Sequence, residues 1–337
     1  NQGESFVVQV YYNANPDTGG GFFAGISNAY SSNWDADVTW TLSEPYAARD
    51  WFPVKQVLPD KADSCWVFLT TDEEYMAGSQ GLLTAVTPMP GNKLRYEWKS
   101  NYPIAYYLIS FAVSDYLEYN IYAKPDEMNG DSILIQNFLY DHPSIIISLK
   151  DDIDQTVEFV ELLSDLYILY PFNEEKYGHC LTQLGGGMEH QTMTTIGGFN
   201  YDLVSHELGH MWFGDNVTCA TWQDIWINEG FASYSEYLAR QYLEGQSSAN
   251  SWMNSTHNNV LSAPDGSVYV PEDELDNIWR IFNGRLYYDK GAAIIHMILF
   301  ELEDDELFFD IMDEFQTRFT DSTATGLDFK GVVEELS

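Results

Sequence analysis

Basic residues are scarce in this chain of 337 residues. It contains 15 Lys and Arg against 52 Asp and Glu, which gives a net charge of −37 with neutral histidines. Proteins that bind nucleic acids neutralise phosphates with clustered Lys and Arg, so the composition argues against a nucleic-acid partner. We interpret most of the carboxylates as solvated surface charges, which also attract cations such as the ammonium group of a peptide.

Cysteines and long apolar runs are rare as well. Cys65, Cys180 and Cys219 permit at most one disulfide and form no CxxC metal pair, so the thiols indicate no compartment. The sequence lacks the run of about 20 apolar residues that a membrane-spanning helix needs, and we expect no membrane span. It also lacks a basic segment followed by an apolar one, so no signal peptide is visible in this chain.

The chain is long enough for two domains, and its aromatic content of 15% indicates packed cores. Over residues 1–142, short apolar runs alternate with turn residues. The runs are SFVVQVYY, ADVTWTL, SCWVFLTT, KLRYEWKS, AYYLISFAV and LEYNIYA. They predict a β-rich N-terminal domain over residues 1–142, either a sandwich or a strongly curved sheet. Because the first run lies close to residue 1, we expect this domain to be incomplete at its start.

From residue 143 the pattern becomes mainly helical. Val157, Val160 and Leu163 recur on one helix face from residue 154, and Pro171 ends that helix. GHCLTQL then predicts a short strand. Further helices are predicted for YDLVSHELGHMWFG, residues 228–243, RLYYDKGAAIIHMILFELED, ELFFDIMDEFQTRF and a segment beginning near Thr325. The fold class is therefore α+β, with a second domain over residues 143–337 that we expect to be truncated.

The stretch SHELGHMWFGD contains two histidines four residues apart. On a helix, His206 and His210 lie on one face and can direct two nitrogens at one Zn²⁺ ion, at about 2.0–2.1 Å. Glu207 follows His206 on the helix, so its side chain is rotated away from the two histidines but can still reach a water molecule bound to the metal. A catalytic zinc takes three protein ligands and one open position, and Glu229 on the next helix is the candidate for the third. A polar helix face is the alternative for the histidine pair alone.

The wider pattern resembles the gluzincin aminopeptidase family, which includes alanyl aminopeptidases and leukotriene A4 hydrolase. HELGH is followed by eighteen residues and then Glu229, in the order of that family. Residues 186–190, GGMEH, resemble its G-x-M-E-N motif, and residues 288–291, YDKG, resemble its Y-E-K-G motif. Residues 43–53, SEPYAARDWFP, resemble the segment of its β domain that reaches the active site. The chain is most similar in appearance to secreted bacterial members.

The resemblance implies a thermolysin-like catalytic domain over residues 143–337 and one zinc ion per chain on His206, His210 and Glu229. Such an ion lowers the pKa of its water from 15.7 toward ~7. Glu207 is then expected to take the proton of this water and pass it to the leaving amine. The hydroxyl of Tyr288 is expected to stabilise the oxyanion.

The same resemblance implies a substrate-binding set formed by Gly186, Gly187, Met188 and Glu189, in which Glu189 holds the free α-amine. Glu44 is expected to add a second acceptor. Each assignment has a simpler alternative. Tyr288, which has Tyr287 beside it, fits a helix tyrosine that only packs. Glu189 fits a solvated turn, and Glu44 fits a surface strand.

Further positions bear on the site. Glu236 lies two helix turns after Glu229, which makes it a candidate for orienting a histidine ligand. His190 stands where the family has Asn, and an imidazole there is expected to bond the substrate backbone or the neighbouring loop. Leu42 stands where many members have Gln, at the rim of the first-residue pocket.

The predicted function is a zinc aminopeptidase that removes a neutral or basic first residue from peptides with a free N-terminus. Two alternatives remain open on the same zinc site: another hydrolase, such as an endopeptidase or an epoxide hydrolase, and a binding module without activity. Export to the periplasm or the medium of a bacterium is expected from the acidic surface and from the similarity to secreted members.

Overall fold

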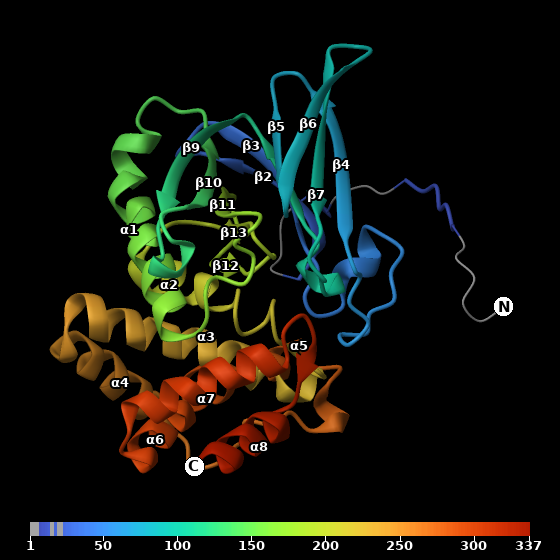
Figure 1. The fold of residues 1–337 in the computed structure, drawn as a ribbon. Coiled ribbons are helices and arrows are strands. Elements are labelled where there is room, and N and C mark those ends of the chain that lie inside the picture. Colours follow the sequence, from blue (N-terminus) through green and yellow to red (C-terminus); the bar gives the residue numbers. More distant parts are fainter. Residues whose placement is uncertain (1–6, 14–16, 19–22) are drawn as a thin grey trace.

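The structure is a computed structural model that describes residues 7–13, 17–18 and 23–337. Figure 1 shows β-sheets at the top of the molecule and helices at the bottom. Strands β1 to β10 come first along the chain, and seven of the eight α-helices among the described residues follow residue 200. The expected α+β fold class is therefore confirmed.

Two sheets contain most of the strands of the first 114 residues. One has the strand order β1-β2-β3-β8-β5, and the other has the order β4-β7-β6. Except for the parallel pair of β1 and β2, neighbouring strands in both sheets are antiparallel. The bounds are β1 (Asp17–Thr18), β2 (Gly25–Ser31), β3 (Ala36–Leu42), β4 (Cys65–Asp72), β5 (Met76–Ser79), β6 (Leu82–Met89), β7 (Lys93–Ser100) and β8 (Phe111–Ser114).

The third sheet has the order β12-β13-β11-β10-β9, with β10, β11 and β13 parallel. Its strands are β9 (Tyr116–Ala123), β10 (Ile133–Tyr140), β11 (Tyr177–Leu181), β12 (Gly187–Met188) and β13 (Thr194–Ile196). The domain boundary predicted at residue 142 falls inside this unit, because β10 pairs with β11 across it. We therefore propose that the second domain begins near Tyr116 instead.

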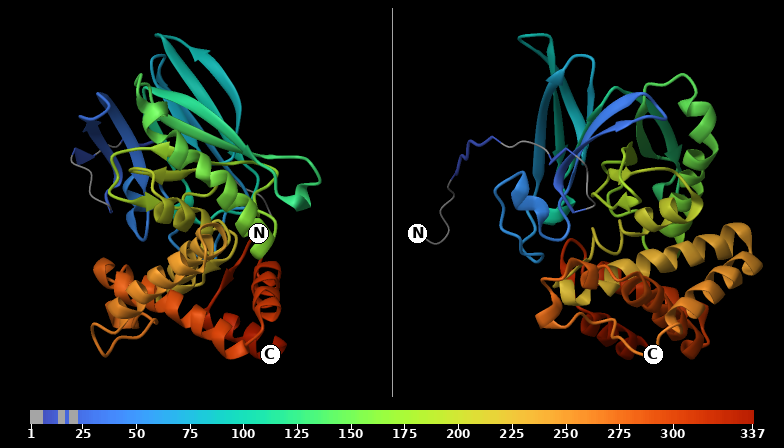
Figure 2. Two further views of the ribbon diagram at one scale, coloured as in Figure 1. Left: turned by 90° about the vertical axis from the view of Figure 1, so that its left-hand side faces the viewer. Right: turned by 180° about the vertical axis from the view of Figure 1, so that it is seen from behind.

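The helices lie against this sheet and beneath it. Helix α1 lies beside β9 and β10 in Figure 1, and the two views of Figure 2 show the helices of the last third gathered below the sheets. The bounds are α1 (Ile145–Leu166), α2 (Tyr201–Gly209), α3 (Trp226–Ala239), α4 (Gln246–Val260), α5 (Ile278–Ile281), α6 (Lys290–Leu302), α7 (Asp305–Arg318) and α8 (Gly326–Leu336). Two π-helical segments, η5 (Arg240–Glu244) and η7 (Gly284–Asp289), continue α3 and precede α6. Two short strands, β14 (Thr218–Cys219) and β15 (Thr323–Ala324), pair in parallel.

Several predicted elements differ from the structure. Residues 7–12 of the predicted first strand form no strand, and Val7 and Tyr11 are each 88% exposed, since no neighbouring strand pairs with them. Residues 5 and 6 of that run lie outside the described residues. The helix predicted through residue 214 ends at Gly209. Helix α4 was missed because its sequence, QSSANSWMNSTHNNV, has few apolar residues to mark a buried face.

Close glycine contacts bring the helices of the second region together. A Cβ atom on Gly209 of α2 would lie 2.7 Å from Oγ of Ser235 on α3, and a Cβ on Gly230 of α3 would lie 2.8 Å from Cα of Gly291 on α6. Only glycine permits such an approach without a shift of the neighbouring helix. These contacts hold α2, α3 and the start of α6 close enough to place their side chains in one pocket.

Candidate functional site

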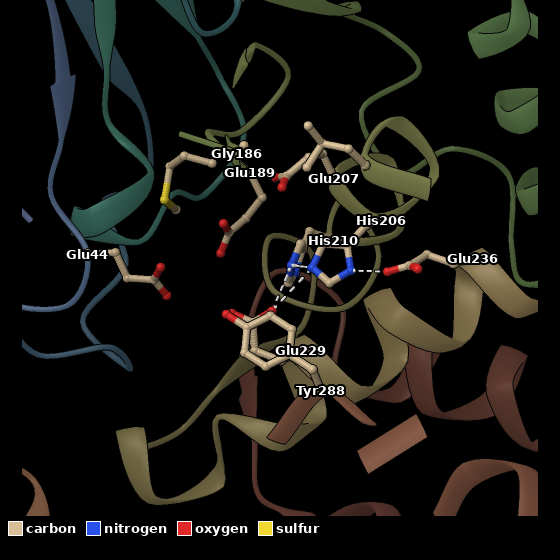
Figure 3. Close-up of a pocket in the computed structure, with 12 residues that line it drawn as sticks. Glu44, Gly186, Glu189, His206, Glu207, His210, Glu229, Glu236 and Tyr288 are labelled. Atoms are coloured by element: carbon tan, nitrogen blue, oxygen red, sulfur yellow. Dashed lines mark hydrogen bonds and ion pairs between the residues drawn. The ribbon is translucent and has the colours of Figure 1, made fainter. Parts of the chain in front are cut away.

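Two histidines and a glutamate converge between α2 and α3. Nε2 of His206 and Nε2 of His210 are 3.1 Å apart, and each lies 3.3 Å from Oε2 of Glu229. Figure 3 shows the three side chains pointing at one position. His206 lies in α2, His210 directly follows α2, and Glu229 lies in the first turn of α3. The helix spacing and the short connection between the helices therefore bring the three predicted ligands together.

The orientation of these three side chains fits a metal ion. Nδ1 of His206 lies 2.8 Å from a carboxylate oxygen of Glu236, and Nδ1 of His210 lies 3.0 Å from the carbonyl oxygen of Phe213. With Nδ1–H donating to these acceptors, both Nε2 lone pairs face the shared position. Oε2 of Glu229 is buried there, and no donor among the described residues is aligned with it. Ligands of a tetrahedral zinc site are about 3.3 Å apart, so the three residues fit zinc.

Glu236 is held on its other side as well. Its second carboxylate oxygen accepts a hydrogen bond from Nε1 of Trp252 on α4, at 2.9 Å. Glu236 follows Glu229 by two turns of α3, so both carboxylates lie on the same side of that helix. The carboxylate therefore fixes the ring of His206 from behind, as the helix spacing predicts.

In the view of Figure 3, Glu207 lies above the three converging side chains, and it is 4% exposed. Its carboxylate packs directly on Gly187, where a Cβ atom would lie 2.3 Å from Oε1 of Glu207. Its Oε2 is buried without a hydrogen-bond partner among the described residues. Burial raises the pKa of Glu207 to about 8. The carboxylate therefore lines the same pocket as His206, His210 and Glu229, and its Oε2 is available to accept a hydrogen bond.

The structure separates the two neighbouring tyrosines of η7. The ring of Tyr288 stacks on the ring of His206, with centroids 5.8 Å apart and an interplanar angle of 10°, and it lines the pocket. Tyr287 is fully buried, and its hydroxyl accepts a hydrogen bond from Arg280. Burial raises the pKa of Tyr288 well above its usual value, so its hydroxyl keeps its proton. Tyr288 is therefore the tyrosine with a donor at the pocket.

Two further carboxylates face the pocket from the opposite side. Glu44 and Glu189 are each 3% exposed, and Oε1 of each is buried without a partner among the described residues. Figure 3 shows both side chains directed toward His210 and Glu229. Burial raises the pKa of Glu44 and of Glu189, and the charge of Glu189 adds to the effect on Glu44. Paired buried carboxylates without donors are suited to bind a cation.

Glu44 reaches the pocket from the N-terminal sheets. It follows β3, and the residues on either side of it are anchored. Nε1 of Trp51 donates to Oγ of Ser43 at 2.8 Å, and the hydroxyl of Tyr106 donates to the carbonyl oxygen of Pro45 at 2.5 Å. Glu44 is therefore not the surface strand residue of the simpler alternative.

The glycines of the GGMEH segment form the wall beside Glu189. Gly186, Gly187 and Met188 all line a pocket of about 330 Å³ that also contains the histidines and Tyr288. Gly186 has φ 127°, a conformation that favours glycine, and its carbonyl oxygen accepts from the amide of Gly197 at 2.8 Å. Strand β12 is the edge strand of its sheet, so one side of its backbone is free of strand partners. All ten predicted site residues therefore line one pocket.

Comparison with known proteins agrees with this geometry. Residues 185–337 match the peptidase family M1 domain. These residues form an M1 peptidase domain. The family expected from the sequence motifs, the gluzincin zinc aminopeptidases, is thereby confirmed.

Relatives of the M1 domain include aminopeptidase N of Mus musculus, 36% identical over 115 residues, which are 31% of this chain and 11% of the relative. Endoplasmic reticulum aminopeptidase 1 of Mus musculus is 25% identical over 290 residues, which are 77% of this chain and 29% of the relative. The chain therefore spans less than a third of the length of these relatives.

A solved structure shares the fold. It is an M1 zinc metallopeptidase mutant from Deinococcus radiodurans bound to a Tyr-ser-ala substrate, with TM-score 0.77 and 21% identity. The alignment covers 89% of this chain and 66% of that one. At this identity the likeness concerns the fold, including the β-rich region that precedes the M1 domain.

The M1 domain also contains buried polar residues that the sequence patterns did not single out. Asp215 is fully buried, and neither carboxylate oxygen has a partner among the described residues. Nζ of Lys61 donates to the carbonyl oxygens of Asp215 and Asn216, at 2.8 and 3.0 Å. The position of Asp215 directly after the HELGHMWFG stretch was the available signal. Lys61 offered none, because it lies in a loop of the N-terminal region.

The two departures from the family pattern lie outside the wall of the pocket. The ring of His190 is fully buried, with Nδ1 2.8 Å from Oγ1 of Thr195, so it bonds the neighbouring strand. Burial lowers the pKa of His190 to about 3. Leu42 is 2% exposed at the end of β3 and packs in the core.

No helix among the described residues has the length and apolar character that crossing a membrane requires.

Proposed function

We propose that this protein is a zinc-dependent aminopeptidase. The proposal rests on two buried carboxylates, Glu44 and Glu189, whose Oε1 atoms have no partner among the described residues. They lie opposite the cluster of three candidate metal ligands (Figure 3). A metal site alone serves many hydrolases. A closed anionic wall beside it favours substrates whose reacting bond lies one residue away from an ammonium group.

The chain supplies a base and a hydrogen-bond donor for the reaction. Bound zinc would acidify a water molecule and polarise the scissile carbonyl group. Glu207 is placed to accept a proton from the attacking water and to transfer it to the leaving nitrogen, which departs as an amine. The hydroxyl of Tyr288 is placed to donate to the oxygen that becomes negative during attack.

We call the part of the pocket formed by Glu44 and Glu189 the amine side, and it sets the position of cleavage. Glu44 and Glu189 close the pocket at one end, so a chain that continued beyond the first residue would have to displace buried carboxylates. An ammonium group in the same place supplies the donors that both Oε1 atoms lack. The negative charge of the pocket also disfavours an acidic first residue, which agrees with a neutral or basic preference.

The comparisons support this choice among the alternatives. Two relatives are named aminopeptidases, and a structure of the same fold is bound to a tripeptide substrate. An endopeptidase would need an open path where Glu44 and Glu189 lie. A binding module without activity would not need the buried Glu207 beside a complete ligand set.

Location outside the cytoplasm of a bacterium belongs to the same proposal. It rests on the acidic composition and on the motif similarity to secreted members. Fractionation of cells that make the native full-length protein tests it, since recovery in the cytoplasmic fraction alone would contradict it.

The direct test compares an aminoacyl anilide with its N-acetylated form. We expect hydrolysis of the free-amine substrate, no measurable hydrolysis of the acetylated one, and loss of activity with a chelator. Lysine or arginine anilides should be cleaved faster than aspartate or glutamate anilides. Preferential cleavage of the acetylated substrate would contradict the proposal and favour an endopeptidase.

A further inference from the structure

The loop that carries Glu189 contains a backbone conformation that its sequence does not favour. Glu189 directly follows β12, and the amide of Met193 donates to the carbonyl oxygen of His190 at 2.9 Å before β13 begins. Thr192 is the third residue of this turn and has φ 62°. A positive φ at this position is typical of a type II turn, where Gly or Asn is usual. For a β-branched residue it is an outlier.

Two buried hydrogen bonds hold Thr192 in this conformation. The amide of Gly81, between β5 and β6, donates to Oγ1 of Thr192 at 2.8 Å. Nζ of Lys176 donates to the carbonyl oxygen of Thr192 at 2.9 Å. Thr192 and Lys176 are both fully buried. A glycine in this turn would relieve the backbone but could not accept the first of these bonds, so the threonine hydroxyl has a specific use.

Both donors belong to the packing between the N-terminal sheets and the third sheet. Gly81 has φ 74°, and a Cβ there would lie 2.3 Å from the carbonyl oxygen of Lys99 on β7. Nζ of Lys176 lies 5.3 Å from the ring centroid of Trp98, also on β7. The turn after Glu189 is therefore held by two groups that themselves pack against β7.

Strained backbone persists only where the surroundings impose it, and it often lies beside functional groups. Oε1 of Glu189 receives no hydrogen bond from the described residues, so its position depends on the backbone of this loop. We propose that Thr192 is a positioning residue that fixes the Glu189 carboxylate for the substrate ammonium group. Its two hydrogen bonds transmit the packing of the N-terminal sheets to the amine side of the pocket. This inference rests on the proposed aminopeptidase function.

The test uses two inhibitors that differ only in the amine. One is the hydroxamate of leucine, and the other is the same hydroxamate without the amino group. In the wild-type protein, the ratio of their inhibition constants measures what the ammonium group contributes. We compare this ratio in Thr192→Val, which keeps the shape but loses the acceptor, and in Thr192→Ser, which keeps the acceptor.

In Thr192→Val we expect binding of the leucine hydroxamate to weaken about 10- to 100-fold, because a displaced anchor no longer meets the ammonium group. Binding of the compound without the amine should stay within about twofold, and Thr192→Ser should behave like the wild type. Equal weakening of both inhibitors, or no change in either, would give Thr192 a purely structural role and overturn the proposal.

Lys176→Met provides a second route if Thr192→Val does not fold. It removes the bond to the carbonyl oxygen of Thr192 and the contact of Nζ with Trp98, but it keeps the bond from Gly81 to Oγ1. It should lower the amine contribution in the same direction by a smaller factor. An unchanged ratio in this variant would overturn the proposal. A wild-type protein that binds both inhibitors equally would instead refute amine binding itself, and the aminopeptidase proposal with it.

Discussion

The two sides of the pocket are built in different ways. On the metal side, His206, His210 and Glu229 come from two consecutive helices, and both histidine Nδ1 atoms have acceptors. On the amine side, Glu44 and Glu189 come from separate regions, and each has a buried oxygen that receives no hydrogen bond from the part of the chain that the structure describes. The metal side directs its ligand atoms at one position, as a metal ion requires, whereas the amine side presents acceptors that suit a group with several donors.

We expect the metal side to carry out the reaction and the amine side to select the substrate. The metal side depends on the geometry of local helices, so its variants should affect every substrate alike. The amine side depends on how the N-terminal sheets pack against the M1 domain, so its variants should change which substrates are accepted. The predictions below test that division, beginning with the largest expected effect.

Replacement of the general base, Glu207, should nearly abolish the reaction without lowering the zinc content. For Glu207→Gln we expect kcat to fall about 10²- to 10⁴-fold on every substrate, because the amide cannot accept the proton. The zinc content should remain that of the wild type, since Glu207 is not one of the three converging ligands. Steady-state rates and elemental analysis check both points. A variant with nearly normal kcat would refute the role of Glu207.

The two tyrosines of η7 provide a matched pair. Tyr288→Phe removes the donor at the pocket, and kcat should fall about 10²- to 10³-fold with little change in KM. Tyr287→Phe removes one of two acceptors of Arg280, which also donates to Glu274, so it should lower the melting temperature and leave kcat unchanged. Kinetics and thermal unfolding of both variants distinguish the two residues. A larger loss of kcat in Tyr287→Phe would reverse the assignment.

The amine side should respond selectively. Glu189→Gln keeps the shape but removes the charge, and kcat/KM for free-amine substrates should fall about 30-fold or more, as for other buried charge pairs. Glu44→Gln should cause a smaller loss, because Glu189 remains. Neither variant should change the zinc content. Unchanged kcat/KM for free-amine substrates in both variants would show that these carboxylates do not bind the amine.

The support behind His206 should matter least. Glu236→Gln weakens the acceptor of the histidine Nδ1–H, and zinc affinity should fall about 10- to 100-fold, while activity with excess zinc stays near normal. Glu244→Gln is the control, because this exposed glutamate of η5 pairs with Arg240 away from the pocket. Zinc titrations of both variants test the effect. Equal zinc affinities of the two variants would show that Glu236 does not support zinc binding.

The metal side could be predicted from the sequence because its information is local. The four-residue spacing of the histidines, the short connection to Glu229 and the two further turns to Glu236 all follow from helix geometry. Resemblance to a family supplied Glu189, Tyr288 and the segment of Glu44. The convergence of these residues in one pocket depends on close packing between helices, which residue spacing does not encode.

The remaining features depend on contacts between distant residues. The boundary predicted at residue 142 missed that β10 pairs with a strand beyond it. Thr192 gave no signal in the sequence, because its positive φ is imposed by Gly81 and Lys176. Asp215 is likewise distinguished only by its burial, since neither of its carboxylate oxygens has a partner among the described residues. Thr192 and Asp215 both contact the N-terminal region, through Gly81 and Lys61 respectively.

The central claim is that His206, His210 and Glu229 hold one catalytic zinc ion. The most direct measurement is the zinc content of the purified protein, with activity followed through dialysis against EDTA and readdition of zinc. The account predicts one zinc per chain, loss of activity as the metal leaves, and recovery as it returns. Full activity in protein from which all metal has been removed would contradict it.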